Sequence, residues 1–332
     1  MCENITPPVA GARGQGSPYQ SIRELKLKIL LTGKNGQVGA ELAAFLPRLG
    51  EVVSFERHEL ELSKPDQNRR AIREVQPNAI VNAAAHTAVD RAETDERQAR
   101  IINVDAPAVM AEEAKKIGAV LVHYSTDYVF DGSQERPYDE TDPPNPINVC
   151  GQTKFAGEEA IRAVGVPHLI FRTAWVYGTR GRNFLLTILR LATEREELKI
   201  VCDQFGAPTW SREIAKGTVS ALEQFTQSSK DTSSRLAGTY HMTAAGKTTW
   251  CEFAEAILER SSRTCRDVAW FAAATGGRPL AARCIIPITT EQYPTPARRP
   301  VYSVLSNSRL KQTFGMELPD WKTQLDSVFA DR

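Results

Sequence analysis

Residues 25–39 read Leu-Lys-Leu-Lys-Ile-Leu-Leu-Thr-Gly-Lys-Asn-Gly-Gln-Val-Gly. The first seven are rich in apolar side chains and predict a β-strand. Gly33, Gly36 and Gly39 follow, and apolar residues then recur at helical spacing, which predicts a tight turn into a helix. Glycines in such a turn let backbone N–H groups approach a pyrophosphate at the helix N-terminus. The stretch therefore predicts a dinucleotide-binding fold, and the alternative is a tight turn that binds no ligand.

The first half of the chain repeats this alternation of strand and helix. The nearly continuous apolar runs suit parallel strands that helices cover on both faces. Asp105 is expected to cap a helix that has Pro107 in its first turn and ends at Gly118. Further strands are predicted at residues 51–55, 79–81, 119–124 and 169–172, and a further helix at 151–163. The predicted fold class is α/β: a doubly wound Rossmann parallel sheet with a smaller α/β substrate-binding lobe.

Beyond about Asn183 the alternation loosens, and helical segments are expected near 183–197, 211–226 and 249–262. Three regions are therefore predicted. Residues 1–24 form a disordered N-terminal extension, or follow a start codon placed too far upstream, because they are polar and lack the apolar core of a secretory signal. Residues 25–182, with returning segments, form the cofactor domain. Residues 183–332 mainly form the substrate lobe, at the carboxyl edge of the sheet.

Composition excludes several classes of protein. Lysine plus arginine (41) nearly equals aspartate plus glutamate (40), so there is no basic footprint for nucleic acid. No apolar run reaches the roughly 18 residues of a membrane helix. The six cysteines are scattered without a C-x-x-C pair. We expect reduced thiols in a cytoplasmic protein, and neither a disulfide framework nor a zinc site.

Two segments offer contacts to a cofactor. The second strand ends in Glu56-Arg57, where a carboxylate can bind the adenosine ribose and an arginine can accept a 2′-phosphate. NADH and NADPH both remain open, as does a solvated ion pair. Residues 82–87, Asn-Ala-Ala-Ala-His-Thr, are small enough for a flat cofactor to lie against the backbone, or for a helix to pack closely. His86 taken alone is a structural histidine as readily as a site residue.

Two more segments carry candidate chemistry. The fourth strand ends in Ser125-Thr126-Asp127-Tyr128, which places a hydroxyl donor at a strand terminus. Cys150 and Lys154 then stand at i and i+4 on one helical face.

Together these segments resemble the extended short-chain dehydrogenase/reductase superfamily, and most closely its dTDP-4-dehydrorhamnose reductase family. The resemblance runs from Leu27 to the C-terminus. Its most specific parts are residues 33–39, 82–90, 123–130, 148–151, 172–177, 203–209 and 299–300.

The resemblance implies reduction of the C4 keto group of dTDP-4-dehydro-L-rhamnose by NADPH or NADH, in the synthesis of bacterial surface polysaccharide. A possible homodimer and, in some members, Mg²⁺ belong to the same expectation; the spacing of residues shows no metal site. Thr126, the residue at position 150 and Lys154 would be catalytic, and Lys154 would also hold the nicotinamide ribose. The substrate would contact Thr126, Asp127, Tyr128 and Trp175. The cofactor would contact Gly33, Gly36, Gln37, Val38, Gly39, Glu56, Arg57, Glu61, Leu62, Ala85, His86 and Thr87, where Glu61 replaces the aspartate common in the family.

Cys150 departs from the family, which has a proton-donating tyrosine at this place. A cysteine side chain ends several ångströms short of a phenol oxygen, so reach is the obstacle and acidity is not. Three explanations remain open: a water relays the proton, the cysteine is an engineered or accidental replacement, or the chain binds a cofactor without catalysis. The last resembles the β subunit of methionine adenosyltransferase. A reductase or epimerase for another nucleotide sugar is a further alternative.

Overall fold

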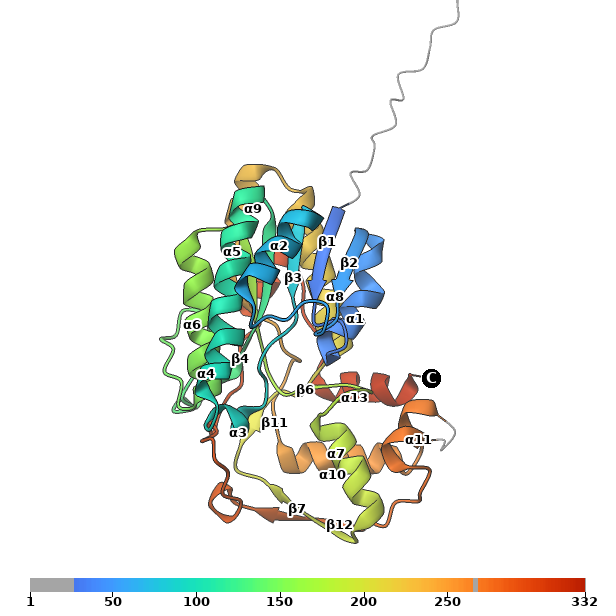
Figure 1. The fold of residues 1–332 in the computed structure, drawn as a ribbon. Coiled ribbons are helices and arrows are strands. Elements are labelled where there is room, and N and C mark those ends of the chain that lie inside the picture. The colour runs from blue at the N-terminus through green and yellow to red at the C-terminus, as the bar shows by residue number, and fades with distance from the viewer. Residues whose placement is uncertain (1–26, 265–267, 332) are drawn as a thin grey trace, which may run out of the picture.

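The computed structural model describes residues 27–264 and 268–331, so the predicted extension at 1–24 lies outside the described residues. Six strands form one sheet in the order β10-β5-β4-β3-β1-β2, and every neighbouring pair is parallel (Figure 1). This confirms the predicted parallel α/β sheet. The strands are β1 (Leu27–Thr32), β2 (Gly50–Phe55), β3 (Ala79–Asn82), β4 (Val120–Thr126), β5 (His168–Thr173) and β10 (Gly238–His241).

Helices cover both faces of the sheet. Successive residues of β1 point to opposite sides: Ile29 and Leu31 join the core under α1 and α8, while Leu30 joins the core under the other helices. A strand buried on both faces needs apolar side chains at every position, which explains the unbroken apolar runs. The helices are α1 (Gln37–Phe45) and α8 (Ser211–Gln227) on one face, and α2 (Pro65–Val75), α5 (Ala106–Ile117) and α6 (Val149–Val164) on the other.

A second, smaller lobe lies beyond the carboxyl ends of the central strands (Figure 1). Its helices share an apolar core of their own, and β7 (Glu197–Val201) pairs in parallel with β12 (Cys284–Ile288). Two-residue pairings join β6 (Val176–Tyr177) to β9 (Thr209–Trp210) and β8 (Phe205–Gly206) to β11 (Thr248–Thr249). The helices of this lobe are α7 (Phe184–Glu194), α10 (Trp250–Ser261), α11 (Ala269–Thr275) and α13 (Trp321–Ala330).

The remaining helices are short and connect these layers. They are α3 (Val89–Ala92), α4 (Glu96–Arg100), a π-helical turn (Ile101–Asp105), α9 (Lys230–Leu236), α12 (Ser308–Phe314), and 3₁₀ turns at Leu46–Arg48, Asp127–Val129 and Thr290–Gln292. Within the described part of the chain, no helix is both long and apolar enough to cross a bilayer.

The predicted position of the helix cap at Asp105 is confirmed, but the expected hydrogen bond from its side chain is not formed. Asp105 has helical backbone angles (φ −68°, ψ −42°), and its side chain caps nothing. The π-helical turn Ile101–Asp105 leads into α5 without a break, and the N–H of Ala106 donates to the carbonyl of Ile101. The predicted end is confirmed: Gly118 closes α5 in the left-handed conformation.

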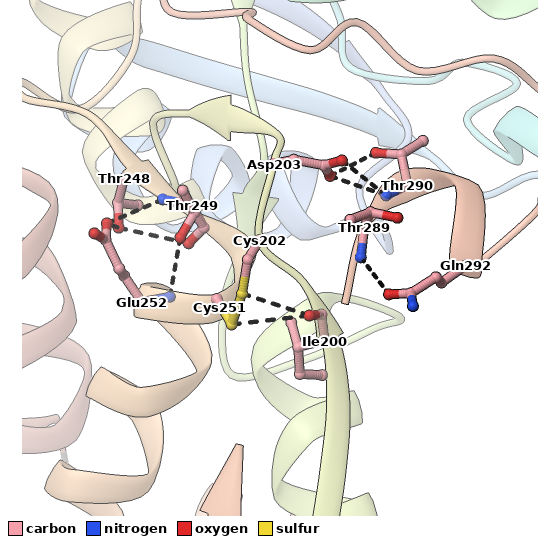
Figure 2. The surroundings of a disulfide bond; sticks show 10 residues. All are labelled: Ile200, Cys202, Asp203, Thr248, Thr249, Cys251, Glu252, Thr289, Thr290 and Gln292. Atoms are coloured by element: carbon pink, nitrogen blue, oxygen red, sulfur yellow. Dashed lines mark hydrogen bonds between the residues drawn. A yellow bond between two sulfur atoms is a disulfide. The ribbon is translucent and has the colours of Figure 1, made fainter. Parts of the chain in front are cut away.

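The expectation of reduced thiols is wrong for one pair. Cys202, just after β7, and Cys251, in the first turn of α10, form a disulfide with Cα atoms 5.0 Å apart (Figure 2). They are 49 residues apart in the sequence, so only the tertiary fold brings them together and no local spacing announces the pair. Cys150 and Cys284 are free thiols.

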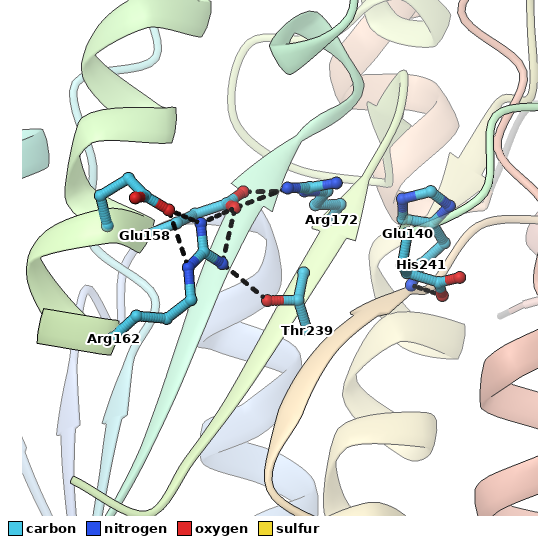
Figure 3. Close-up of polar contacts among 7 residues, drawn as sticks. Glu140, Glu158, Arg162, Arg172, Thr239 and His241 are labelled. Atoms are coloured by element: carbon cyan, nitrogen blue, oxygen red, sulfur yellow. Dashed lines mark hydrogen bonds and ion pairs between the residues drawn. The ribbon is translucent and has the colours of Figure 1, made fainter. Parts of the chain in front are cut away.

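A buried ion pair fastens α6 to the sheet (Figure 3). Arg172 on β5 donates to both carboxylate oxygens of Glu158, at 2.9 and 2.7 Å, and Arg162 adds bonds at 3.2 and 3.1 Å. Burial acts to raise the pKa of Glu158, but the bonds from Arg172 outweigh it and the pKa lies below its usual range. The Glu158 carboxylate is therefore charged, and its bonds to Arg172 and Arg162 stabilise that charge inside the protein.

We predict that Arg172→Met destabilises the protein by about 3–5 kcal/mol, because it leaves Glu158 buried without its main partner. The measurement is the free energy of unfolding by urea. Arg190→Met is the matched control: Arg190 pairs with Glu194 on the surface, and its loss should change the stability by less than about 1 kcal/mol. Equal effects of the two substitutions would contradict the structural role of the buried pair.

Candidate active site

The glycine turn after β1 is shaped to receive an anion. Gly33 has φ +73°, and a Cβ on Gly39 would lie 1.9 Å from the carbonyl oxygen of Gly33, so larger residues do not fit the turn. Helix α1 begins at Gln37 with no side-chain cap at Gly36. The N–H groups of its first turn are therefore left for a ligand, and the turn fits the pyrophosphate of a dinucleotide.

The second lobe contacts this turn directly. Asn183 caps α7 by accepting from Leu186 N–H, and its Nδ2 donates to Gln37 Oε1 at 2.9 Å. Gln37 Nε2 in turn donates to the carbonyl of Arg182 at 3.4 Å. The loop before α7 therefore fixes the Gln37 side chain beside the anion site.

The residues predicted to surround adenosine lie at and after the end of β2. Glu56 is half-buried and lies 3.5 Å from Lys34 Nζ and 3.4 Å from His58 Nδ1, while Arg57 is exposed. Glu61 bonds Lys64 and Ser63, and these bonds lower the pKa of its carboxyl. Leu62 is buried in the core on the face of the sheet that α2 and α5 cover, so its side chain anchors the segment after β2 to that core.

A buried asparagine that sequence reasoning missed fixes the segment after β3. Asn103, in the π-helical turn, accepts from the backbone N–H of His86 at 2.9 Å and donates to its carbonyl at 3.2 Å. It also donates to Thr153 on α6 at 3.1 Å. Ala85 and His86 are half-buried, and Thr87 is exposed. The available signal was a polar residue within the apolar run Ile101-Ile102-Asn103-Val104.

Thr126 and Asp127 stand together at the end of β4. The Thr126 hydroxyl donates to Asp127 Oδ1 at 2.9 Å and accepts from Tyr128 N–H at 3.2 Å. Asp127 is buried, its Oδ2 has no partner among the described residues, and burial raises its pKa to about 6. A buried oxygen without a partner, beside a hydroxyl at a strand end, is suited to a polar ligand.

Cys150 lies in the first turn of α6, next to Tyr128. Asn148 caps the helix by accepting from Gly151 N–H at 2.8 Å, and a Cβ on Gly151 would lie 2.0 Å from the carbonyl oxygen of Tyr128. The Cys150 thiol is buried, and burial raises its pKa to about 11 although Lys154 acts in the opposite direction. At neutral pH the thiol keeps its proton.

Lys154 lies one turn further along α6 and is also buried. Its Nζ donates to the carbonyl oxygen of Tyr124 and lies 3.4 Å from His123 Nε2, both on β4. Burial lowers the pKa of Lys154 to about 8, and interactions with Glu158 and with the thiolate form of Cys150 offset only part of this effect.

Trp175, after β5, belongs to an aromatic stack. Its ring stacks on Trp250 at the start of α10, with centroids 3.4 Å apart and planes 5° apart, and Phe184 lies 4.5 Å from Trp250. A Cβ on Gly206 would lie 2.3 Å from the Trp175 ring, so a residue with a side chain does not fit beside this ring. Sequence reasoning missed Trp250; the capping threonine before it marks the start of a helix but not the direction of the indole.

Asp203, in one of the segments that carry the family resemblance, makes contacts within the second lobe. Its carboxylate accepts from the backbone N–H and the hydroxyl of Thr290, as Figure 2 shows. Across residues 27–264 and 268–331, no group of three or more His, Cys, Asp or Glu side chains is arranged to hold a metal ion. We therefore assign no residue to Mg²⁺.

The parallel topology gathers the candidate residues. Thr32, Asn82 and His123 are in register on β1, β3 and β4, so the segments that follow these strands emerge at one edge of the sheet. The second lobe covers this same edge (Figure 1), where ligands bind in open α/β sheets. The arrangement can hold an extended dinucleotide and a polar substrate next to Lys154.

Comparison with known proteins supports the same conclusion. The family model described as the RmlD substrate binding domain matches residues 27–332. The dTDP-4-dehydrorhamnose reductase of Burkholderia thailandensis is 51% identical over 296 residues, covering 89% of this chain and 96% of the relative. The Escherichia coli K12 protein of the same name is 43% identical over 312 residues, covering 92% and 99%.

A solved structure agrees in fold. The Bacillus anthracis dTDP-4-dehydrorhamnose reductase in complex with NADP superposes with a TM-score of 0.81 at 31% identity, covering 93% of this chain and 100% of that one. The resemblance inferred from the sequence is thereby confirmed, and the chain belongs to the dTDP-4-dehydrorhamnose reductase family.

Proposed function

We propose that this protein reduces the C4 keto group of dTDP-4-dehydro-L-rhamnose to dTDP-L-rhamnose with NADPH or NADH. The observation that carries the proposal is that the glycine turn after β1 and Thr126 at the end of β4 lie at the same edge of the sheet, with Lys154 bonded to Tyr124 on β4. The 51% identity to a protein named for this activity supports the choice of substrate.

The cofactor-binding residues act by position. First-turn N–H groups of α1, at Gln37, Val38 and Gly39, bind the pyrophosphate. Glu56 binds the adenosine ribose, with exposed Arg57 beside it, an arrangement that leaves both cofactors acceptable. When bound, the reduced nicotinamide supplies the hydride for the C4 carbonyl carbon.

The backbone beside the nicotinamide must be rigid for a hydride to transfer over a short distance. Asn103 supplies this rigidity by bonding both backbone groups of His86. Ala85 is small enough for the cofactor to lie against the chain, and Thr87, which is exposed, lies at its outer side.

The substrate-binding residues hold the sugar nucleotide. Thr126 can turn its hydroxyl proton from Asp127 to the C4 oxygen, and Asp127, with a pKa of about 6, retains a free oxygen for a sugar hydroxyl. The Tyr128 and Trp175 rings border the sugar. The stacking of Trp175 on Trp250 holds the Trp175 ring in one orientation.

Cys150 changes one step only. Its thiol is protonated at neutral pH because burial raises its pKa, but its sulfur lies nearer the helix than a phenol oxygen would. We propose that hydride transfer is intact and that proton delivery to the C4 oxygen is slower than with a tyrosine.

The second candidate function is a non-catalytic subunit that binds the cofactor, and Cys150 is the observation that favours it. Calorimetry separates the two functions. Binding of NADPH together with dTDP-L-rhamnose supports the reductase, whereas tight binding of NADPH with no binding of the nucleotide sugar supports the subunit.

We further propose that the protein works in the cytoplasm as a homodimer. Reduced nicotinamide cofactor is regenerated in the cytoplasm, which supports the first part, whereas the Cys202–Cys251 disulfide is an observation against it. The second rests on the family resemblance and on the prevalence of twofold dimers among soluble proteins. Sedimentation equilibrium measures the mass of the assembly.

We predict that Cys150→Tyr raises kcat at least about tenfold, the low end of a general-acid contribution. The assay follows NADPH oxidation with dTDP-4-dehydro-L-rhamnose. Cys150→Phe is the matched control, since it adds the ring without the hydroxyl and should give no gain. Rapid turnover at the same rate in all three forms would place Cys150 outside the proton path.

We also predict that Asp127→Asn stabilises the free protein while weakening the binding of dTDP-L-rhamnose. The folded pKa of Asp127, about 6, lies above the unfolded value near 4, so ionisation costs folding free energy as the pH rises from about 4 to 6. The gain in Tm should therefore be small at pH 4, grow up to pH 6 and stay constant above. A stability difference independent of pH would contradict the ionisation of a buried Asp127.

A further inference from the structure

Lys154 occupies a buried position whose one nearby carboxylate is already paired with arginines. The titratable and charged groups that face it are Cys150 and Glu158 on α6 and His123 on β4. The thiol of Cys150 is uncharged at neutral pH. Glu158 accepts bonds from Arg172 and Arg162 (Figure 3), so much of its negative charge is compensated, and it offsets only part of the effect of burial on Lys154. The surroundings therefore stabilise an ammonium ion weakly.

The tautomer of His123 follows from its hydrogen-bond partners. The backbone N–H of Ala84 and the hydroxyl of Thr32 both donate to Asn82 Oδ1, at 3.3 and 2.7 Å. The Asn82 amide is thereby oriented with its Nδ2 toward His123 Nδ1, at 3.1 Å. Since Nδ2 is a donor, Nδ1 must accept, and a neutral imidazole then carries its proton on Nε2. His123 is neutral because burial, and secondarily Lys154, holds its pKa well below the usual range.

The Nε2–H of His123 points toward Lys154 Nζ, 3.4 Å away. An amine has a lone pair that accepts this bond, whereas an ammonium has none. His123 therefore stabilises the deprotonated form of Lys154, and the Tyr124 carbonyl accepts a proton of Nζ in either form. Both contacts come from β4, the strand that also ends in Thr126.

We propose that Lys154 is the general acid of this enzyme, in place of the missing phenol, and that His123 is a positioning residue for it. The inference rests on the proposed reductase function. As hydride adds to C4, the C4 oxygen takes a proton from the Lys154 ammonium, directly or through one water. One N–H bond breaks and one O–H bond forms, leaving an amine that accepts from His123. The amine regains a proton from solvent before the next turnover.

The pH profile of kcat follows from this assignment. The protonated form of Lys154 is the reactive one, so activity is present below its pKa of about 8 and is lost as the pH rises through that value. Cys150 titrates higher, at about 11, so the two residues predict different profiles.

The first test combines substitutions at two positions. Lys154→Arg keeps a cation to hold the cofactor ribose, but arginine does not release a proton near neutral pH. In the natural chain we expect it to lower kcat at least about 100-fold, within the range of a lost general acid. In the Cys150→Tyr form, where a phenol delivers the proton, the same change should cost less than about tenfold.

The second test uses a matched pair at His123. His123→Phe removes the Nε2–H donor, so the amine form of Lys154 loses its stabilising bond and the pKa of Lys154 rises. The pH at which kcat falls on the basic side of its profile should therefore move upward by about one unit. His123→Gln can offer an amide N–H at the same place and should leave the limb near the parent value. A purely structural role for His123 would lower the amount of active protein without moving the limb.

The outcomes separate this inference from the proposed function. An inactive Cys150→Tyr form overturns the reductase function itself. If the Cys150→Tyr form is active but the natural chain shows no turnover, only the proposed role of Lys154 is overturned. Equal losses from Lys154→Arg in both backgrounds also overturn it, since Lys154 then serves the cofactor alone.

Discussion

A side chain at Gly151 or Gly157 would collide with the backbone carbonyl of Tyr128 or Asn103, each at 2.0 Å. Helix α6 therefore approaches both neighbouring segments at backbone contact. On its other side the Glu158–Arg172 pair ties the same helix to β5. These contacts remove the freedom of α6 to slide or rotate. The position of every group that it carries toward the sheet edge depends on them.

The close packing of α6 has an electrostatic consequence. Burying the helix against the sheet removes water from Lys154 and Cys150, which lowers the pKa of the amine to about 8 and raises that of the thiol to about 11. Burial alone brings the pKa of Lys154 toward neutral pH and moves the pKa of Cys150 away from it. The helix that would have presented a phenol thus still presents one group that can exchange a proton near pH 8.

Much of this arrangement was predictable from local sequence. The apolar runs and the Gly33 turn suffice for the parallel sheet, since a strand buried on both faces and a turn at φ > 0 leave few other solutions. The helical spacing of Cys150 and Lys154 predicted their shared face. What local sequence did not reveal depends on residues far apart in the chain: the Cys202–Cys251 pair, the stack of Trp250 on Trp175, and the bonds of Asn103. Asp105 holds the predicted cap position without a side-chain cap bond, because the preceding π turn gives it helical backbone angles.

We propose that Cys150, at the place where the family resemblance implies a tyrosine, slows a single step, the delivery of a proton to the C4 oxygen. Single-turnover NADPH oxidation measured in H₂O and in D₂O tests it most directly. If proton transfer limits the rate, the natural chain turns over more slowly in D₂O, and the Cys150→Tyr form is less affected. Identical rates of the natural chain in the two solvents would contradict the claim.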